Sequence, residues 1–210
     1  KLFGYLSAQV DRDFEVIVVD QSESRWSDSA KNFGFMMTYY HSPVKGAVRA
    51  RNTGAMLAQG EIIAFIDDDC FPDPRWLLNA RPYFKDNSAL GLEGIIESDH
   101  LKDPAWRPVS NVGFEGLGFM TANLFVRSEV FQLLGGFDLQ FDHPHFREDT
   151  DLGWRIQELG EIPYAKDVSV FHPALPTHIE RESAQERAKF FQKDAILYQK
   201  HKEKYKQLFF

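Results

Sequence analysis

The stretch IIAFIDDD, residues 62–69, joins the clearest predicted strand of the chain to three consecutive acids. Five apolar residues in a row are typical of a strand that is buried on both faces of a parallel sheet. Ligands of such sheets collect beyond the carboxyl ends of the strands. The three aspartates therefore mark a candidate binding site at the end of this strand.

Short apolar runs alternate with helix-period stretches along the rest of the chain. A second buried strand is predicted at residues 16–19 and ends at Asp20, and a last strand at 168–171 ends at His172. Further strands are expected at 35–40, 90–97 and 121–126, and helices at 47–59, from Asp73 onward, at 128–134 and at 148–159. This alternation predicts the α/β class, with a mostly parallel sheet flanked by helices.

The length of 210 residues favours a single domain, because no linker or internal repeat divides the chain. We expect a domain over residues 1–179 and a C-terminal helix over 180–210 that packs on it. The apolar positions of this helix form a stripe at helical spacing, made of Ala184, Ala188, Phe191, Ala195 and Tyr198. Its lysines and aromatic residues offer an alternative, a peripheral contact of the last turns with an anionic membrane surface.

The composition excludes several classes of protein. A hydrophobic share of 43% is ample for a core and excludes disorder. The net charge of −7 provides no basic stripe, so no nucleic-acid partner is expected. The single cysteine, Cys70, excludes a disulfide framework and a zinc site of four thiolates. No apolar run is long enough to span a bilayer and no leader is visible, which predicts a cytoplasmic enzyme.

The three consecutive aspartates indicate a metal site. Asp67 and Asp69 are two residues apart and point the same way if the chain stays extended, while Asp68 points oppositely. Neighbouring carboxylates repel each other unless a cation lies between them. Mg²⁺ and Mn²⁺ are hard cations that take such oxygen ligands and complete their shells with water and phosphate. The alternative is a solvated turn, because aspartate is common after strands.

A second group of acids opens the helix predicted at 148–159. Glu148, Asp149 and Asp151 lie in its first turn, where acids are routine because they interact favourably with the helix dipole. At about 100° per residue, Glu148 and Asp149 flank the apolar stripe and can reach the interior, whereas Asp151 points further out. The periodicity does not choose between Glu148 and Asp149 as a functional carboxylate.

Several segments, taken in order, resemble the nucleotide-sugar glycosyltransferases of family 2. They are FEVIVVDQS at 14–22, GAVRARNTG at 46–54, AQGEI at 58–62, FIDDD at 65–69, GGFD at 135–138 and EDTDL at 148–152, followed by Arg155. The order and spacing of these segments match the family over most of the chain, as far as His172. The resemblance implies a GT-A fold and an inverting transfer of a sugar from a nucleoside diphosphate.

The resemblance places the nucleotide near the end of the first predicted strand. It implies that Asp20 holds the base or ribose of the donor. Ser22, Arg49 and Arg51 are the further candidates near the nucleotide. The alternative for the two arginines is a surface position on a helix, which is the commoner place for this residue type.

The resemblance also assigns roles to the triple aspartate. Asp67 and Asp68 lie near the ribose and diphosphate of the donor in this interpretation. Asp69 is the most direct ligand of Mn²⁺ or Mg²⁺, and Asp67 and His172 complete the metal site. The alternative for His172 is a strand-end histidine that faces solvent.

For catalysis, the resemblance identifies Asp149 as the base and Glu148 as a residue that orients it or contacts the acceptor. A base is needed because a sugar hydroxyl is a poor nucleophile at neutral pH, and a carboxylate can take its proton as attack proceeds. The metal neutralises the charge that develops on the departing diphosphate. Arg155 is expected to pair with Glu148 or with the diphosphate.

The implied donor is a UDP-sugar, and the implied acceptor is a saccharide or lipid-linked hydroxyl in bacterial polysaccharide or glycoconjugate synthesis. The Gln-x-x-Arg-Trp motif of processive synthases is absent, which favours transfer of a single sugar. A nucleotidyltransferase of related fold and a non-catalytic glycosyltransferase-like module are the alternatives. Family members begin with a strand of the type P-x-V-S-V-V-I-P-T-Y-N, and this chain starts in the helix after it, so we expect a fragment that lacks this first strand.

Overall fold

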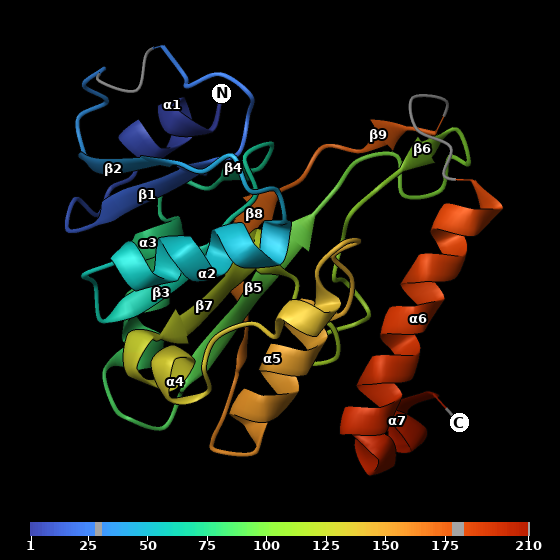
Figure 1. The fold of residues 1–210 in the computed structure, drawn as a ribbon. Coiled ribbons are helices and arrows are strands. Elements are labelled where there is room, and N and C mark those ends of the chain that lie inside the picture. The colour runs from blue at the N-terminus through green and yellow to red at the C-terminus, as the bar shows by residue number, and fades with distance from the viewer. Residues whose placement is uncertain (28–30, 178–182, 210) are drawn as a thin grey trace.

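Five strands form the central sheet of the computed structural model, which describes residues 1–27, 31–177 and 183–209 (Figure 1). Their order is β3 (Ile62–Phe65), β7 (Leu124–Arg127), β5 (Gly91–Glu97), β8 (Tyr164–Phe171) and β4 (Phe71–Pro72). Strands β5 and β8 pair in parallel, and the other pairings are antiparallel. The α/β class is confirmed, and the sheet is mixed where mostly parallel strands were expected. Strand β7 runs antiparallel to β5 because the connection between them returns at the same end of the sheet, without a crossover helix.

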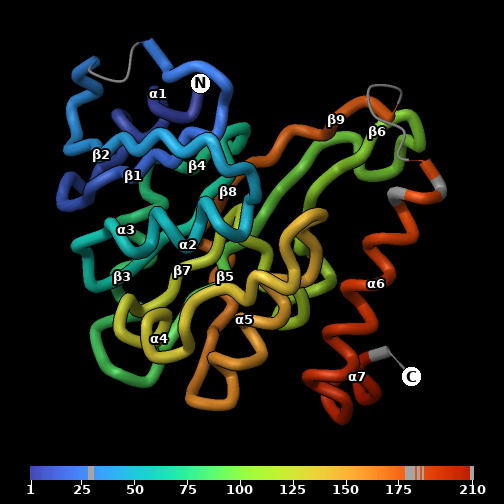
Figure 2. Tube along the Cα trace, viewed as in Figure 1, coloured from blue at the N-terminus to red at the C-terminus, as the bar shows by residue number. Residues whose placement is uncertain are grey.

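Two smaller strand pairs accompany this sheet. β1 (Glu15–Asp20) and β2 (Met36–His41) pair in parallel beside helix α1 (Leu2–Ser7). β6 (Trp106–Arg107) and β9 (Leu175–Pro176) form an antiparallel arm that extends away from the sheet (Figure 2). Among the described residues, β1 pairs only with β2, and β3 pairs only with β7. Strands β1 and β3 therefore each have one edge without a partner strand. The absence of a first strand stays a prediction.

Helices cover both faces of the central sheet. α2 (Ala47–Leu57), α4 (Ser128–Leu133) and α5 (Glu148–Gln157) lie on one face, and α3 (Trp76–Ala80) lies on the other (Figure 1). Two hydrophobic clusters fill the layers between helices and sheet. The first includes Val48, Phe65, Phe131, Leu152 and Trp154, and the second includes Leu6, Cys70, Trp76, Leu92 and Val170.

Three 3₁₀ turns interrupt the regular elements, namely η1 (Arg81–Phe84), η2 (Thr121–Asn123) and η3 (Leu139–Phe141). The strand predicted at 121–126 therefore begins only at Leu124. The cause is Asn123, whose side-chain amide donates to the carbonyls of Ile95 and Val168 at 2.8 and 2.9 Å. This buried side chain joins β7 to the parallel strands β5 and β8.

The single C-terminal helix expected from Glu180 is wrong. The structure has two helices, α6 (Ala184–Lys200) and α7 (Lys202–Phe209), with a turn at His201. The turn lets both helices contact α5, since Lys200 of α6 pairs with Asp151 and Lys204 of α7 bonds to Gln157. Glu180 itself and the expected boundary between residues 179 and 180 lie outside the described residues.

The buried face of α6 also differs from the predicted stripe. Ala188, Phe191 and Ala195 are exposed, whereas Lys193 and Leu197 are buried. A hydrophobic pattern misses this face because Lys193 enters it by donating hydrogen bonds to two backbone carbonyls, which offset the burial of its charge. None of the helices in the described ranges is long and apolar enough to cross a membrane.

Candidate active site

Four side chains that can bind a metal gather where β8 meets the segment after β3. One ligand atom from each of Asp67, Asp69, Cys70 and His172 lies within 4.8 Å of the others. We call these four residues the ligand cluster. The strand register explains it, because β4 places Phe71 opposite Phe171 in an antiparallel pair, so Cys70 and His172 are the next neighbours. The structure thus brings together the three residues that were expected to bind a metal, and adds Cys70.

His172 presents one ring nitrogen to the ligand cluster. Its side chain is 7% exposed, and its Nδ1 donates a hydrogen bond to the carbonyl of Pro173 at 3.1 Å. In the neutral imidazole this leaves the lone pair on Nε2, which lies 3.5 Å from Oδ1 of Asp69. A lone pair and a carboxylate repel each other, and a cation between them converts the repulsion into attraction. These oxygen and imidazole donors therefore fit a divalent cation such as Mn²⁺ or Mg²⁺.

Asp68 lies apart from the ligand cluster. Its side chain is exposed, whereas Asp67 and Asp69 are partly buried. The chain turns directly after β3, as the hydrogen bond from the Cys70 N–H to the Asp67 carbonyl shows. A contact of Asp68 with the ribose or diphosphate stays a prediction.

Cys70 was missed as a member of the site, because the single cysteine served only to exclude thiolate-rich classes. The residue is fully buried. Burial, together with the negative charges of Asp67 and Asp69, raises the pKa of its thiol to about 12. Its position directly after three aspartates was the signal in the sequence that could have placed it there.

Arg51 of α2 joins the ligand cluster to the start of α5. Its guanidinium donates to Oε1 of Glu148 at 2.7 Å and lies 3.5 Å from Oδ1 of Asp67. The Arg51 and Glu148 side chains are 18% and 4% exposed, so solvent screens this pair only weakly. Two groups of acids that are far apart in the sequence therefore belong to one site. Arg49, in contrast, is exposed, and its place near a nucleotide stays a prediction.

Asp149 follows Glu148 on α5 and is only partly exposed. Burial and the negative charge of Glu148 raise the pKa of Asp149 to about 7, against the opposing effects of Arg51 and Thr150. The backbone N–H of Thr150 donates to Oδ1 of Asp149 at 2.7 Å. A carboxyl group with a pKa near neutrality is suited to exchange protons at working pH. The structure thus separates the two carboxylates that the periodicity could not, because Glu148 is held in an ion pair.

Asp151 is fully buried, so the expectation that it points further out is wrong. Its carboxylate lies 2.9 Å from Arg155, 2.7 Å from Lys200 and 2.9 Å from His201. Burial opposes ionisation, but the hydrogen bonds from His201 and Lys200 outweigh it and hold the pKa of Asp151 below its usual range. Arg155, expected to pair with Glu148 or a diphosphate, is instead bound to Asp151. The helical periodicity failed here because α6 and α7 cover this face of α5.

Asp20 lies at the end of β1, where its carboxylate is already fully hydrogen-bonded. Oδ1 accepts from the N–H and the hydroxyl of Ser22 at 2.9 and 2.5 Å. Oδ2 accepts from the Tyr39 hydroxyl at 2.5 Å and the Trp26 N–H at 3.2 Å. The bonds from Ser22 and Tyr39 hold the pKa of Asp20 well below its usual range, and together the four bonds fill the carboxylate's acceptor positions. Asp20 thus organises the loop after β1, and contact of Asp20 or Ser22 with a nucleotide stays a prediction.

Helix α6 holds the segment that leads into α5. The ammonium group of Lys193 donates to the carbonyls of Gln140 and Asp142 at 2.6 and 2.7 Å. Asp194 accepts a hydrogen bond from Nε of Arg147 at 2.7 Å. Arg147 directly precedes Glu148 and has a left-handed backbone with φ 71°, a conformation that costs free energy in a residue with a side chain. The contacts from α6 therefore help to fix the start of α5.

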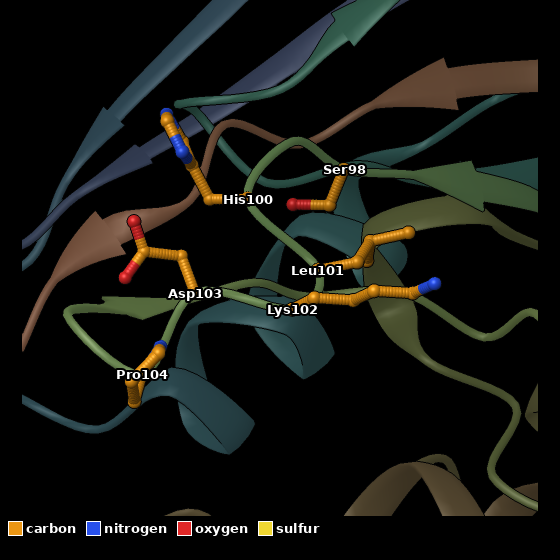
Figure 3. A pocket seen from close by; sticks show the side chains of 6 residues that line it. All are labelled: Ser98, His100, Leu101, Lys102, Asp103 and Pro104. Atoms are coloured by element: carbon orange, nitrogen blue, oxygen red, sulfur yellow. The ribbon is translucent and has the colours of Figure 1, made fainter.

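An open cavity of about 660 Å³ lies at the loop that follows β5 (Figure 3). It is lined by Ser98, His100, Leu101, Lys102, Asp103 and Pro104. Ser98 connects it to the cluster, because its hydroxyl donates to the carbonyl of His172 at 2.7 Å. The ring of His100 stacks on Trp106, with ring centroids 4.1 Å apart. The cavity thus offers polar side chains and an imidazole ring, and Ser98 ties its wall to the backbone of His172.

The chain matches a protein-family model described as glycosyl transferase family 2 over residues 5–147. A pre-mycofactocin glycosyltransferase of Mycobacterium tuberculosis is 29% identical over 171 residues, which are 71% of this chain and 35% of that protein. The glycosyltransferase AglE of Haloferax volcanii is 27% identical over 180 residues, which are 78% of this chain and 58% of that protein. The chain thus spans between a third and three fifths of these two relatives. The family match ends directly before Glu148.

Solved structures share the fold at low sequence identity. TarS 1–349 of S. aureus, solved in complex with UDP-GlcNAc, has a TM-score of 0.66 and 15% identity, over 91% of this chain and 59% of that one. The mannosyltransferase PcManGT of Pyrobaculum calidifontis, solved with GDP-Man and Mn²⁺, has a TM-score of 0.61 and 19% identity, over 81% and 51% of the two chains. The fold is therefore that of the GT-A glycosyltransferases, as the sequence predicted.

Proposed function

Because the chain belongs to glycosyltransferase family 2, we propose that it transfers a single sugar, with inversion, from a nucleoside-diphosphate sugar to a hydroxyl group. The proposed donor is a UDP-sugar. The proposed acceptor is a saccharide or a lipid-linked molecule of bacterial polysaccharide or glycoconjugate synthesis. The transfer is proposed to depend on Mn²⁺ or Mg²⁺.

The observation that carries this proposal is the position of Arg51 between Asp67 and Glu148. Sugar transfer needs a group that stabilises the departing diphosphate and a base that activates the acceptor, both within one site. Asp67 belongs to the ligand cluster, and Glu148 is the neighbour of the proposed base. One guanidinium group contacts both, which supports a single reaction centre between the end of β3 and the start of α5.

We assign the cation to Asp69 and His172, with Asp67 as a further ligand. These residues would hold a divalent cation, which would neutralise the negative charge that grows on the diphosphate as the sugar leaves. The side chains of Asp67 and Asp69 are 35% and 45% exposed, so a ligand can reach them from solvent. His172 lies behind them as a fixed donor, and Asp68 is placed near the ribose and diphosphate.

We assign the role of base to Asp149. Its ionised carboxylate takes the proton of the acceptor hydroxyl while the acceptor oxygen attacks the anomeric carbon. The bond from that carbon to the diphosphate breaks on the opposite side, so the configuration inverts. Glu148 stays paired with Arg51, and its charge raises the proton affinity of Asp149, whereas Arg51 limits this rise so that the ionised form persists near neutral pH.

The nucleoside end of the donor is assigned to the loop after β1 and to Arg49. Asp20 holds this loop through Ser22 and Trp26, so its removal is expected to weaken nucleotide binding even without direct contact. The acceptor is assigned to the cavity lined by the loop after β5. If the acceptor is lipid-linked, the exposed residues Lys206 and Leu208 of α7 are the candidates for a peripheral membrane contact.

Sugar transfer is tested with a panel of nucleotide sugars and either Mn²⁺ or Mg²⁺, by measuring the nucleoside diphosphate released. We expect release with a UDP-sugar, and its loss in Asp149→Asn. The matched control is Glu129→Gln, because Glu129 also lies in the first turn of a helix but is exposed on α4. Release by Asp149→Asn at the wild-type rate would show that this carboxylate is not the base.

Metal dependence is tested by thermal denaturation with UDP, GDP or dTDP, each with and without Mn²⁺. We expect stabilisation that needs both nucleotide and metal, because the cation joins the diphosphate to the ligand cluster. Asp69→Ala should abolish the part that depends on metal. Stabilisation by nucleotide that a chelator leaves unchanged would contradict the metal assignment.

A further inference from the structure

The thiol of Cys70 distinguishes this ligand cluster from one built for a hard cation alone. Its sulfur lies within 4.8 Å of the ligand atoms of Asp67, Asp69 and His172. The residue is completely buried, whereas Asp67 and Asp69 are partly exposed. The proposed reaction makes no use of this sulfur, so its presence among the donors calls for a chemical explanation.

The spacing of the four donor atoms is close to that of a tetrahedral zinc site. Zinc bonds of about 2.3 Å to sulfur and 2.0–2.2 Å to nitrogen or oxygen place neighbouring donors about 3.3–3.7 Å apart. Donor atoms up to 4.8 Å apart therefore need to close by no more than about 1.5 Å. The two aspartates are partly exposed and can supply this movement, since Asp67 has only a 3.5 Å contact with Arg51. Cys70 and His172 are already fixed by their burial.

The identity of the donors also favours a softer metal. Mg²⁺ and Mn²⁺ prefer oxygen ligands and keep open positions for water and phosphate, and a thiolate adds little to their binding. Zn²⁺ binds sulfur, imidazole nitrogen and carboxylate oxygen, and four such protein ligands fill its shell. The imidazole is prepared for this role, because Nδ1 of His172 is engaged by the Pro173 carbonyl and Nε2 faces the cluster.

We propose that Cys70, His172, Asp67 and Asp69 form a high-affinity Zn²⁺ site that competes with Mn²⁺ or Mg²⁺. Cys70 binds as the thiolate, and its proton leaves to solvent. Zinc bound by all four residues has no open position for a diphosphate, so it closes the site to the donor. This inhibitory consequence rests on the proposed glycosyl transfer, whereas zinc binding itself does not.

Cobalt provides the direct test of the ligand set in the unmodified protein. Co²⁺ replaces Zn²⁺ in tetrahedral sites, and a thiolate ligand gives it a near-ultraviolet charge-transfer band that oxygen and nitrogen ligands do not. We expect this band, together with the strong visible bands of tetrahedral cobalt, at one equivalent of Co²⁺, and their loss when Zn²⁺ is added. A cobalt complex without the charge-transfer band would overturn the proposal, whatever the behaviour of any variant.

The Cys70→Ser variant tests the contribution of sulfur to affinity. Zinc affinity is measured by competition with a chromophoric chelator, and Mn²⁺ affinity by electron paramagnetic resonance. We expect Zn²⁺ binding to weaken by about 100-fold or more and Mn²⁺ binding to change by less than about threefold. Thermal denaturation of the metal-free variant checks its fold. Equal zinc affinity in the variant and the unmodified protein would contradict the proposal.

The inhibitory consequence is tested separately, by titrating Zn²⁺ into the transfer assay at fixed Mn²⁺. We expect inhibition that excess Mn²⁺ reverses, and a half-inhibiting zinc concentration that rises in Cys70→Ser by the factor by which zinc affinity falls. Failure to detect any sugar transfer would count against the proposed function and leave the cobalt and zinc binding results standing. Inhibition that is equal in both proteins would place the inhibitory zinc elsewhere.

Discussion

Asp149 and Asp151 lie two residues apart on α5, and the structure shifts their pKa values in opposite directions. Burial and the neighbouring charge of Glu148 raise the pKa of Asp149 to about 7. Asp151 is also penalised by burial, but His201 and Lys200 hold its pKa below the usual range. The difference does not come from depth alone, since burial disfavours the charged form of both carboxylates. It comes from the charges that each face of the helix meets.

The two faces of α5 consequently serve different purposes. One face contacts Arg51, whose guanidinium group is shared by Glu148 and by Asp67 of the ligand cluster. The other face meets α6 and α7, where Asp151 is surrounded by Arg155, Lys200 and His201. Where acidic groups outnumber cationic groups, a carboxylate can take up a proton, which suits catalysis. Where cationic groups outnumber acidic groups, the carboxylate stays charged and holds the neighbouring elements together.

Asp149→Asn gives the largest expected effect and tests the catalytic face. We expect kcat to fall about 1,000-fold, because a positioned base contributes about 10²–10⁴-fold. Stability at pH 8 should stay equal or rise, since the substitution removes a carboxylate whose charged form the folded state disfavours. UDP binding in the presence of Mn²⁺, measured by calorimetry, should remain near the wild-type value. Loss of binding together with activity would place Asp149 in the donor site instead.

Asp151→Asn is the matched change on the anchoring face. It removes the carboxylate that Arg155, Lys200 and His201 share, and we expect a loss of about 3 kcal/mol in the free energy of unfolding. For a domain of this size this lowers Tm by about 6–12 °C. The lowered pKa of Asp151 means that its contribution is present above the unfolded pKa and is lost as the pH falls through the folded value. The stability difference should thus be full at pH 7 and shrink in acid, and a difference that grows in acid would contradict the ion-pair account.

The pH profile of kcat/KM reports the charge balance on the catalytic face. Asp149 must be ionised to act as a base, so kcat/KM should fall about tenfold per pH unit below a pKa of about 7 and level off above it. Arg51→Gln removes a cation that favours the ionised form, and the acidic limb should move to higher pH. An acidic limb that stays in place in Arg51→Gln would show that Arg51 does not affect the ionisation of Asp149. A limb near pH 4 in the wild type would contradict the raised pKa of Asp149.

Lys193→Met should give the smallest effect. Lys193 ties α6 to the segment before α5 by hydrogen bonds to two buried carbonyls, and we expect its loss to cost about 1–2 kcal/mol of stability. Lys189→Met, one turn earlier on α6 at an exposed position, is the matched control and should change stability by less than about 0.5 kcal/mol. Equal effects of the two substitutions would mean that α6 does not anchor through Lys193.

The elements that could be predicted from the sequence are those whose own residues show a clear hydrophobic pattern. The apolar runs at 16–19 and 62–66 predicted β1 and β3, and the alternating segment at 168–171 predicted the end of β8. The helices expected at 47–59 and 148–159 correspond to α2 and α5, each of which ends two residues earlier than expected. The ordered motifs then led to the GT-A fold, which the comparisons confirm.

The features that could not be predicted depend on partners distant in the sequence. Periodicity treats a charged side chain as exposed, so it misplaced Asp151 and missed the buried Lys193, whose partners come from other elements. The role of Arg51 was missed in the same way, because nothing local reveals that Glu148 lies beside it. The pairing of β4 with β8 brings Cys70 beside His172, and β4, with two residues, is too short for a sequence pattern to predict.

The most direct test of the central claim, that the ligand cluster and the start of α5 form one reaction centre, is a crystal structure with UDP and Mn²⁺, in which anomalous scattering locates the metal. We predict a manganese peak bonded to Asp69 and His172, with the diphosphate directed toward Asp149 and with Arg51 still in contact with Glu148. A manganese peak away from these ligands, or a diphosphate that points away from α5, would contradict the account.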